Sequence, residues 1–483
     1  MNRMIQIKTS IHDRFSVEFK INFSGQEQHH HLFKMNLWLF VPNSLNINAA
    51  TYAKDQFYRD VKSNVRLKTP VFTLEQMADP DSVPVKCLKQ ALAHYESDSS
   101  KYSDLEFHVK MYVAIFKSAL RDETRALQSQ EQSQLTDDRV RGYLDAIRQI
   151  TSHYRTVMAT FAERGDDLDP LAVFAMGDEY MSHLAELHAT RLLRHTDKMG
   201  LAHDDPERQM IADSVAAEHQ YKIAHGYAHF NADSVAESRD MFQRQNTLKK
   251  YVESALYLKS DTGPDGAAAQ QLTFSVAAGI AMLVSMLIAL PFQKYLGQYP
   301  TLIFIILVIA YMLKDRIKEY ARNRFAHRLK AHYFDMKSKV FFRGKKVVHI
   351  KEGMDYIGDD KIPAEVLRAR HRSALDNSIP LEQAMLYRKQ VDIDNAALRE
   401  HYEYSYDGIN DITRIHLQYL TLKMDDPMTT ISVIDETENV RMVEVPRVYN
   451  IYIVLQCTVE GTTEYYCFKL MTSRNGIEAC VEA

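Results

Sequence analysis

LTFSVAAGIAMLVSMLIALPF at residues 272–292 and YPTLIFIILVIAYML at residues 299–313 are the two stretches that decide the fold. Neither contains Asp, Glu, Lys or Arg, and Lys294 is the single charged residue between them. An α-helix rises 1.5 Å per residue, so about 20 apolar residues cross the roughly 30 Å hydrocarbon core of a bilayer. The two runs therefore predict a two-helix transmembrane hairpin.

Basic residues beside this hairpin predict its orientation, because Lys and Arg are retained on the cytoplasmic side of a membrane. The connecting loop carries only Lys294, whereas seven basic residues follow the second run: Lys314, Arg316, Lys318, Arg322, Arg324, Arg328 and Lys330. We expect a multi-pass protein of the cell (inner) membrane with both termini cytoplasmic. The same residues can bind anionic lipid headgroups, at about 1 kcal/mol each, or act only as topology determinants on a solvated helix.

Small residues on the first run predict close helix packing. Ser275 and Gly279 are four residues apart, as are Ala281 and Ser285, and such pairs let two helix backbones approach. The second run is bulky and aliphatic, which suits packing within the hairpin and equally suits a helix from another subunit. Neither run contains an ionisable residue, the usual mark of a carrier. A pore lined by Thr273, Ser275 and Ser285 from several subunits stays open as an alternative.

The composition of the whole chain is that of a globular protein. Of 483 residues, 46% are hydrophobic and 25% are charged, and the net charge of −4 gives no reason to expect a nucleic-acid partner. The four cysteines lack CxxC spacing, which argues against a zinc site or a disulfide framework and fits a reducing compartment: Cys87, Cys457, Cys467 and Cys480.

Outward from the hairpin, the chain divides into regions of different periodicity. Residues 16–23 and 35–41 predict strands, joined by a polar turn over 25–31, and a helix is expected over 50–63. Four further strands are expected near the C-terminus, over 441–445, 448–457, 464–471 and 477–481. A short helix is expected over 364–376, and the second apolar run is expected to continue as one rod to about Met336.

Between residues 102 and 260 the spacing is helical. One stripe repeats every three or four residues and is typical of a bundle: Val140, Leu144, Ile147, Thr151, Tyr154, Met158 and Phe161. A break is expected at 165–170, with Asp169 as N-cap and Pro170 at the first helical position. The helix after the break repeats the stripe from Val173 to Leu187, and a third long helix is expected from near Pro206 to Tyr257.

These patterns predict an α+β multidomain membrane protein with four parts. They are a β-rich cytoplasmic domain (1–98), a helical bundle (99–265), the transmembrane helical hairpin (266–316), and a basic helix followed by a C-terminal antiparallel β-rich domain (317–483). Two folded regions that enter and leave one hairpin would lie side by side.

Several histidines have a spacing that would suit metal ligands on a helix. His225 and His229 share a face if their helix continues, and Glu179, His183 and Glu186 share a face of the preceding helix. A solvated face or a hydrogen-bonded core position explains them more simply, and His219 lies on an apolar stripe as a core histidine would. No catalytic motif or phosphate-binding loop is present in the sequence. We therefore assign no catalytic, cofactor or metal residue.

The leading interpretation is a two-pass inner-membrane protein with large cytoplasmic domains that acts as a membrane-anchored binding, scaffolding or sensing protein. Its expected partners are the lipid bilayer, anionic lipid headgroups, further copies of the chain and a protein of unknown identity. The first alternative is an oligomeric channel or membrane-permeabilising effector gated by the cytoplasmic domains. The second is a membrane-tethered metalloenzyme.

Overall fold

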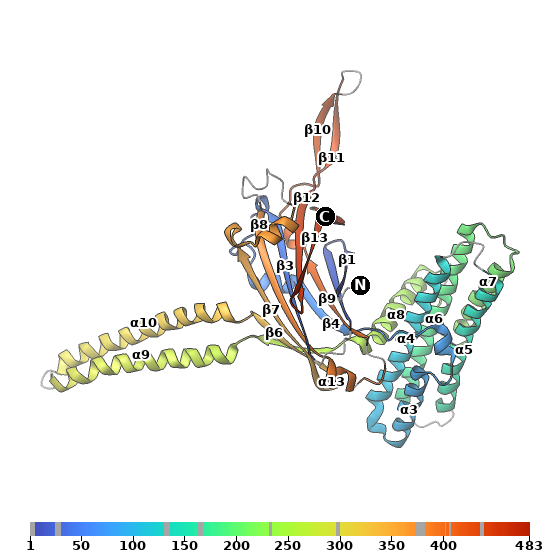
Figure 1. Cartoon of the computed structure of the whole chain (residues 1–483), viewed down its shortest axis with the longest axis horizontal. Coiled ribbons are helices and arrows are strands. Elements are labelled where there is room, and N and C mark those ends of the chain that lie inside the picture. Colours follow the sequence, from blue (N-terminus) through green and yellow to red (C-terminus); the bar gives the residue numbers. More distant parts are fainter. Residues whose placement is uncertain are drawn as a thin grey trace.

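In the described residues, the computed structural model contains two large antiparallel sheets and a separate two-stranded one, with a helical bundle on one side of the large sheets and a long helical hairpin on the other (Figure 1). A mixed α+β multidomain fold with N-terminal strands, helices and C-terminal antiparallel sheets is thereby confirmed. The structure describes residues 5–24, 30–129, 136–162, 168–230, 234–295, 300–371, 382–400, 402–404, 407–434 and 439–483.

Within the described part of the chain, eight strands form the larger sheet, in the order β14-β13-β12-β3-β8-β7-β6-β5. Its middle strand β3 (His30–Pro42) pairs with β12 and β8, so the β-rich regions expected over 1–98 and 317–483 share one sheet. The other strands are β5 (Lys259–Pro264), β6 (Met336–Phe342), β7 (Lys345–Ile357), β8 (Glu382–Asp394), β12 (Tyr449–Val459), β13 (Thr462–Ser473) and β14 (Gly476–Glu482).

The smaller sheet packs against one face of the larger. Its order is β1 (Ile5–Asp13), β2 (Ser16–Ser24), β9 (Gly408–His416) and β4 (Val61–Leu67). Alternate residues of β2 are fully buried, and the Phe19 ring lies 5.7 Å from that of Phe468 on β13. The opposite face of β3 buries Trp38 and Phe40 in a second apolar cluster beside α11 (Ala364–Ala369). Burial on both faces explains the nearly continuous apolar sequence of β3.

The strands expected over 16–23 and 35–41, and the four expected near the C-terminus, are confirmed as parts of β2, β3, β11, β12, β13 and β14. Among the described strands, β11 (Val440–Pro446) pairs only with β10 (Met428–Ile434), in a separate two-stranded hairpin. The helix expected over 50–63 is wrong in its second half. Helix α1 spans Lys54–Asp60, and Val61 then begins β4, because pairing with β9 buries Val65 and Leu67. Most of the turn expected over 25–31 lies outside the described residues.

Helices α2 to α8 form the bundle, and the stripe expected on α5 is buried from Val140 to Tyr154. The long helix expected from Pro206 to Tyr257 is wrong, because α7 ends at Ala224 and Gly226 adopts a left-handed φ of 67°. Helix α6 begins at Leu168, so Asp169 and Pro170 lie inside the helix and the predicted N-cap is wrong, whereas residues 163–167 before it lie outside the described residues. The bounds are α2 (Leu74–Ala78), α3 (Val83–Ser97), α4 (Tyr102–Gln128), α5 (Asp137–Ala162), α6 (Leu168–Met199), α7 (Pro206–Ala224) and α8 (Val235–Glu253).

The helical hairpin is an insertion between two neighbouring strands of the larger sheet. Strand β5 leads into α9 (Ala267–Tyr295), and α10 (Pro300–His332) returns to β6, which pairs with β5 along its length. The rod expected beyond Leu313 is confirmed by α10, which is continuous to His332. Helices α13 (Asn395–Glu400) and α14 (Gln418–Thr421) are short. The helix expected over 364–376 is shorter than predicted, because α11 ends at Ala369 and His371 takes a φ of 51°, while residues 372–376 lie outside the described residues.

Candidate functional site

The hairpin of α9 and α10 is the candidate functional site, because its apolar side chains are exposed. Leu272, Leu283 and Leu287 of α9 are 68%, 62% and 68% exposed, and Phe304 and Ile309 of α10 are also exposed. An apolar helix in the core of a soluble protein buries such side chains. In Figure 1 both helices extend away from the sheets, on the side opposite the bundle. A contiguous apolar surface of this extent indicates contact with a membrane or a partner.

Among the described residues, one of the two predicted transmembrane helices has the length and composition to cross a membrane. In the part of the chain that the structure describes, the span Ala267–Ile288 of α9 is the single segment that qualifies. The apolar part of α10 ends at Leu313, where Lys314, Asp315 and Arg316 follow. From Pro300 to Leu313 a helix rises about 20 Å, which is less than the roughly 30 Å of a hydrocarbon core.

Small side chains form the contact between the two helices. Ala277 and Ala281 of α9 are completely buried, and Ala310 of α10 is 2% exposed. Ser285 lies at the same contact, where its hydroxyl donates a hydrogen bond to the Ala310 carbonyl at 3.3 Å. The hydroxyl is thereby satisfied without water, as an apolar surrounding requires. Close approach of small residues thus holds the hairpin together.

Ser275 and Gly279 lie outside this contact. Both are exposed, and a Cβ atom added at Gly279 would meet no atom within 4 Å among the described residues. The Ser275 hydroxyl donates to the Gln271 carbonyl of its own helix at 3.0 Å. Of the two predicted small pairs, Ala281 and Ser285 therefore face α10, whereas Ser275 and Gly279 face outward.

The predicted basic residues lie on the half of α10 nearer the sheets, since α10 runs back towards β6 (Figure 1). Lys318, Arg322 and Arg324 are exposed. Arg316 is 84% exposed and lies 3.5 Å from Glu319, and the Lys314 ammonium lies 3.8 Å from the centroid of the Tyr311 ring. The side chains of two members of the set lie outside the described residues, namely Arg328 and Lys330.

One contact fixes where these charges lie relative to α9. The Arg322 guanidinium lies 4.8 Å from the centroid of the Phe274 ring, near the beginning of α9. Ser285, about three turns further along α9, contacts Ala310. The basic half of α10 therefore runs beside the first apolar half of α9. In the outer half of the hairpin the apolar runs of both helices lie together, and Lys294, next to the end of α9, is the single charged residue there.

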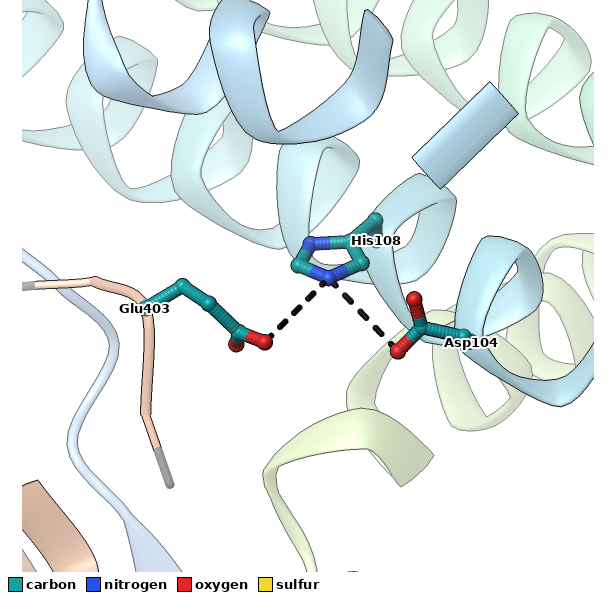
Figure 2. A group of neighbouring side chains, drawn as sticks. All are labelled: Asp104, His108 and Glu403. Carbon is teal, nitrogen blue, oxygen red and sulfur yellow. Dashed lines mark ion pairs between the residues drawn. The ribbon is translucent and has the colours of Figure 1, made fainter. Parts of the chain in front are cut away.

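A polar cluster joins the bundle to the sheets (Figure 2). Asp104 and His108 are one turn apart on α4, and Glu403 comes from the segment after α13. The His108 Nε2 atom lies 3.8 Å from Asp104 and 3.9 Å from Glu403, and its Nδ1 atom lies 2.9 Å from the Tyr404 hydroxyl. Burial lowers the pKa of His108, so the imidazole is neutral near pH 7.

The donor set of this cluster, one imidazole and two carboxylates, could ligate a divalent cation by its chemistry. Arg343, from the turn between β6 and β7, already pairs with both carboxylates: it contacts Asp104, and its Nη1 atom lies 2.6 Å from Glu403. Burial by itself raises the pKa of Glu403, but hydrogen bonds from Arg343 and the backbone reverse this and lower it. Because the Arg343 guanidinium already pairs with both carboxylates, the cluster is better suited to joining bundle and sheets than to holding a metal.

The carboxylates proposed from the sequence as metal ligands in the bundle are also paired with cations. Glu179 accepts two hydrogen bonds from the Arg244 guanidinium of α8, one of them at 2.7 Å. Glu186 pairs with the buried Lys222 ammonium and lies 3.2 Å from the Nδ1 atom of His219. Burial lowers the pKa of His183 to about 4. These contacts cross-link α6 to α7 and α8.

His225 and His229 do not share a helix face, because both follow the end of α7. The Nδ1 atom of His225 lies 2.9 Å from the Tyr221 carbonyl, and that of His229 lies 3.1 Å from the Tyr227 carbonyl. His219 is a third exposed rather than buried, and its ring centroid lies 5.7 Å from that of His229. The helical spacing on which the predicted pair depended is lost at Gly226.

Sequence reasoning did not find the cluster of Asp104, His108, Arg343 and Glu403. The spacing of Asp104 and His108 was a visible signal, since residues four apart meet on a helix. Arg343 and Glu403 come from more than two hundred residues further along the chain, and no local pattern connects them. Comparisons with family models, with curated proteins and with solved structures found no match. Proposals about function therefore rest on the geometry of the chain itself.

Proposed function

We propose that this chain is a membrane-anchored binding or scaffolding protein, with the hairpin of α9 and α10 embedded in an inner membrane and the sheets and bundle in the cytoplasm. The observation that carries the proposal is the exposed apolar surface of the hairpin. Leu, Ile, Phe and Val each favour insertion at a helix centre by about 0.3–0.6 kcal/mol. Exposed side chains of these types along α9 and α10 together supply several kcal/mol.

The root of the hairpin, where β5 and β6 lie side by side, supports a placement of the sheets and the bundle on the same side of the membrane. Strands β5 and β6 are hydrogen-bonded neighbours, with Pro264 opposite Met336. A hairpin whose two ends leave one sheet edge together enters and leaves a bilayer at the same surface. The basic half of α10, next to that root, is then at the depth of the lipid headgroups. Long Lys and Arg side chains can extend towards the headgroups from slightly deeper positions.

A second candidate is an oligomeric channel or membrane-permeabilising effector, and one observation favours it. Ser275 and Gly279 face away from α10, so the small-residue surface of α9 is open to a helix of another copy. Gly279→Leu would block such an approach without touching α10. The channel candidate expects a defined oligomer in mild detergent and ion flux in vesicles, both lost in Gly279→Leu. A monomeric wild-type chain that conducts no ions would exclude it.

The anchor is tested by removing the hairpin at its root. Because the Asp265 amide donates a hydrogen bond to the Asp335 carbonyl, residues 266–334 can be replaced by an Asn-Gly turn that closes β5 on β6. This replacement keeps the Asp335 carboxylate, which accepts hydrogen bonds from Lys54 and Tyr58. We expect the full chain to float with lipid vesicles and to resist carbonate extraction, and the shortened chain to stay soluble with unchanged unfolding of the sheets. A full chain that stays soluble, or a shortened chain that still floats, would refute the anchor.

The depth of insertion needs a separate measurement. Tyr295→Cys, in a chain whose half-buried Cys480 is replaced by Ser, places a thiol at the far end of α9. A membrane-impermeant maleimide added to intact spheroplasts labels it only if the hairpin crosses the bilayer. Labelling supports two full passes. Protection until the membrane is opened shows instead that the hairpin enters from the cytoplasmic side without crossing, as the short apolar run of α10 would allow.

A further inference from the structure

A cavity of about 190 Å³ lies between the two sheets, close to the root of the hairpin. Its walls come from β4 of the smaller sheet and from β5, β6, β7 and β8 of the larger one. An apolar cavity of about 150 Å³ is large enough to bind benzene. This cavity therefore has room for a small organic molecule.

Oxygen atoms are frequent in the walls of this cavity. Ser63 and Ser338 contribute hydroxyls, and the Ser338 hydroxyl is hydrogen-bonded to that of Thr262 at 2.7 Å. The Tyr387 hydroxyl donates a hydrogen bond of 2.5 Å to the Glu352 carboxylate. Among the described residues that line the cavity, Glu352 is the only charged one, and it is 8% exposed.

The charge of Glu352 is not neutralised by the lysine beside it. Lys389 of β8 is opposite Glu352 in the sheet register. Its ammonium instead donates hydrogen bonds to Asp411 at 2.6 Å, to Ser63 at 2.7 Å and to Thr413 at 3.2 Å. The second carboxylate oxygen of Asp411 accepts no hydrogen bond from the described residues. Because Lys389 pairs with Asp411, the Glu352 carboxylate makes no ion pair among the described residues, and it faces the cavity as a counter-ion for a bound cation.

Aromatic side chains form much of the remaining wall of the cavity. Tyr58, Tyr257 and Tyr387 all line the cavity, together with apolar side chains such as Met336 and Val340. Aromatic rings together with a carboxylate bind organic ammonium ions, because both attract a cation while the rings also cover its methyl groups. An anion would meet a buried carboxylate, and a bare metal ion would be too small to contact walls this far apart.

We propose that the cavity between the sheets binds a small organic ammonium ion, with Glu352 as its counter-ion and Tyr58, Tyr257 and Tyr387 around it. The cavity is formed entirely by the sheets and the segments beside them, so this proposal stands or falls independently of membrane embedding. Organic ammonium ions are a class of ligand for the two sheets that no sequence motif indicated.

Choline and its neutral analogue of the same shape, 3,3-dimethylbutan-1-ol, are the matched probes. Binding is measured by isothermal titration and by the shift in melting temperature, with the full chain in a non-ionic detergent. We expect saturable binding of choline and at least about tenfold weaker binding of the neutral alcohol, since the cation–π and carboxylate contacts require the charge. Equal binding of the two compounds, or no saturable binding of choline, would overturn the proposal.

Two variants locate the site. Glu352→Gln keeps an acceptor for the Tyr387 hydroxyl but removes the charge, and we expect at least about tenfold weaker choline binding. Tyr257→Leu changes a side chain that is 45% exposed, so it tests an aromatic wall with little risk to folding; we expect about three- to tenfold weaker binding. Glu75→Gln, at an exposed carboxylate on α2, is the control and should bind like the wild type. Wild-type affinity in both Glu352→Gln and Tyr257→Leu would refute the site.

Discussion

A single carboxylate on the hairpin gives the sharpest test of its proposed membrane role. Leu283 lies in the middle of α9 and is 62% exposed, so Leu283→Asp removes almost no packing within the chain. Leu422, after the short helix α14, is 59% exposed and offers the same substitution outside the hairpin. If only Leu283 is in lipid, Leu283→Asp and Leu422→Asp will differ in membrane binding although their side chains have similar exposure.

The expected size of the effect follows from transfer free energies. Leu at a helix centre favours insertion by about 0.3–0.6 kcal/mol, whereas Asp opposes it by about 2.5–3.5 kcal/mol. Leu283 lies at the inner edge of the apolar outer half, so Leu283→Asp should weaken insertion by at most about 3–4 kcal/mol, which corresponds to up to roughly a 100- to 1000-fold lower partition into lipid. Exposed substitutions away from special sites change the free energy of unfolding by only about 0.5 kcal/mol. Folding of the sheets and bundle should thus be unaffected in both variants.

The assay is flotation with vesicles over a wide range of lipid concentration, which gives the partition coefficient of each chain. We expect Leu283→Asp to lose most of its bound fraction and Leu422→Asp to match the wild type. A partition coefficient for Leu283→Asp within about threefold of the wild-type value would correspond to less than 1 kcal/mol. That result would show that this face of α9 is not in lipid. An equal loss in Leu422→Asp would show a general effect of added charge.

Three further predictions concern packing, pH and buried charge. Ala281→Leu overfills the contact between α9 and α10, and we expect it to destabilise the hairpin by about 1–3 kcal/mol. The two helices should then move apart, which is measured as a longer distance between spin labels on α9 and α10. Burial lowers the pKa values of His183 and His188 to about 4, whereas a histidine in the unfolded chain titrates near 6.5. The unfolded chain then binds more protons, so the free energy of unfolding should fall between about pH 6.5 and pH 4, by at most about 3 kcal/mol for each histidine, in denaturant titrations. Lys389→Met leaves the Asp411 carboxylate buried without a partner, and we expect a loss of about 3–5 kcal/mol on thermal or denaturant unfolding.

Each of these expectations has a control within the chain. Gly279→Ala on the exposed face of α9 should leave the distance between the helices unchanged, unlike Ala281→Leu. His188→Gln should flatten the acid dependence, and an unchanged slope would mean that His188 is not the titrating group. Lys389→Met combined with Asp411→Leu should recover much of the lost stability, because removal of both buried charges is close to neutral. No recovery would mean that packing, not charge, explains the loss.

Local patterns predicted elements well where consecutive residues carry the signal. The alternation from Val17 to Phe23 and the helical stripe from Val140 to Tyr154 both correspond to buried faces, since periodicity of two or 3.6 residues depends only on neighbours along the chain. Prediction failed where a distant partner or one backbone conformation decides the outcome. Val61 starts a strand because β9 pairs with it, and the helix before Gly226 ends where that residue takes a positive φ.

The sequence by itself determined that this chain has two long uncharged apolar runs and a basic segment after them, because charge and apolarity belong to each residue whatever its surroundings. Only the tertiary structure decided that these runs form a hairpin inserted between β5 and β6, with Ala281 inside the contact and Ser275 outside it. It also placed Glu352 in the wall of the cavity, paired the nearby Lys389 with Asp411, and brought Glu403 to His108. Such contacts join residues that are far apart in the chain, so they are set by strand register and packing, which no local pattern contains.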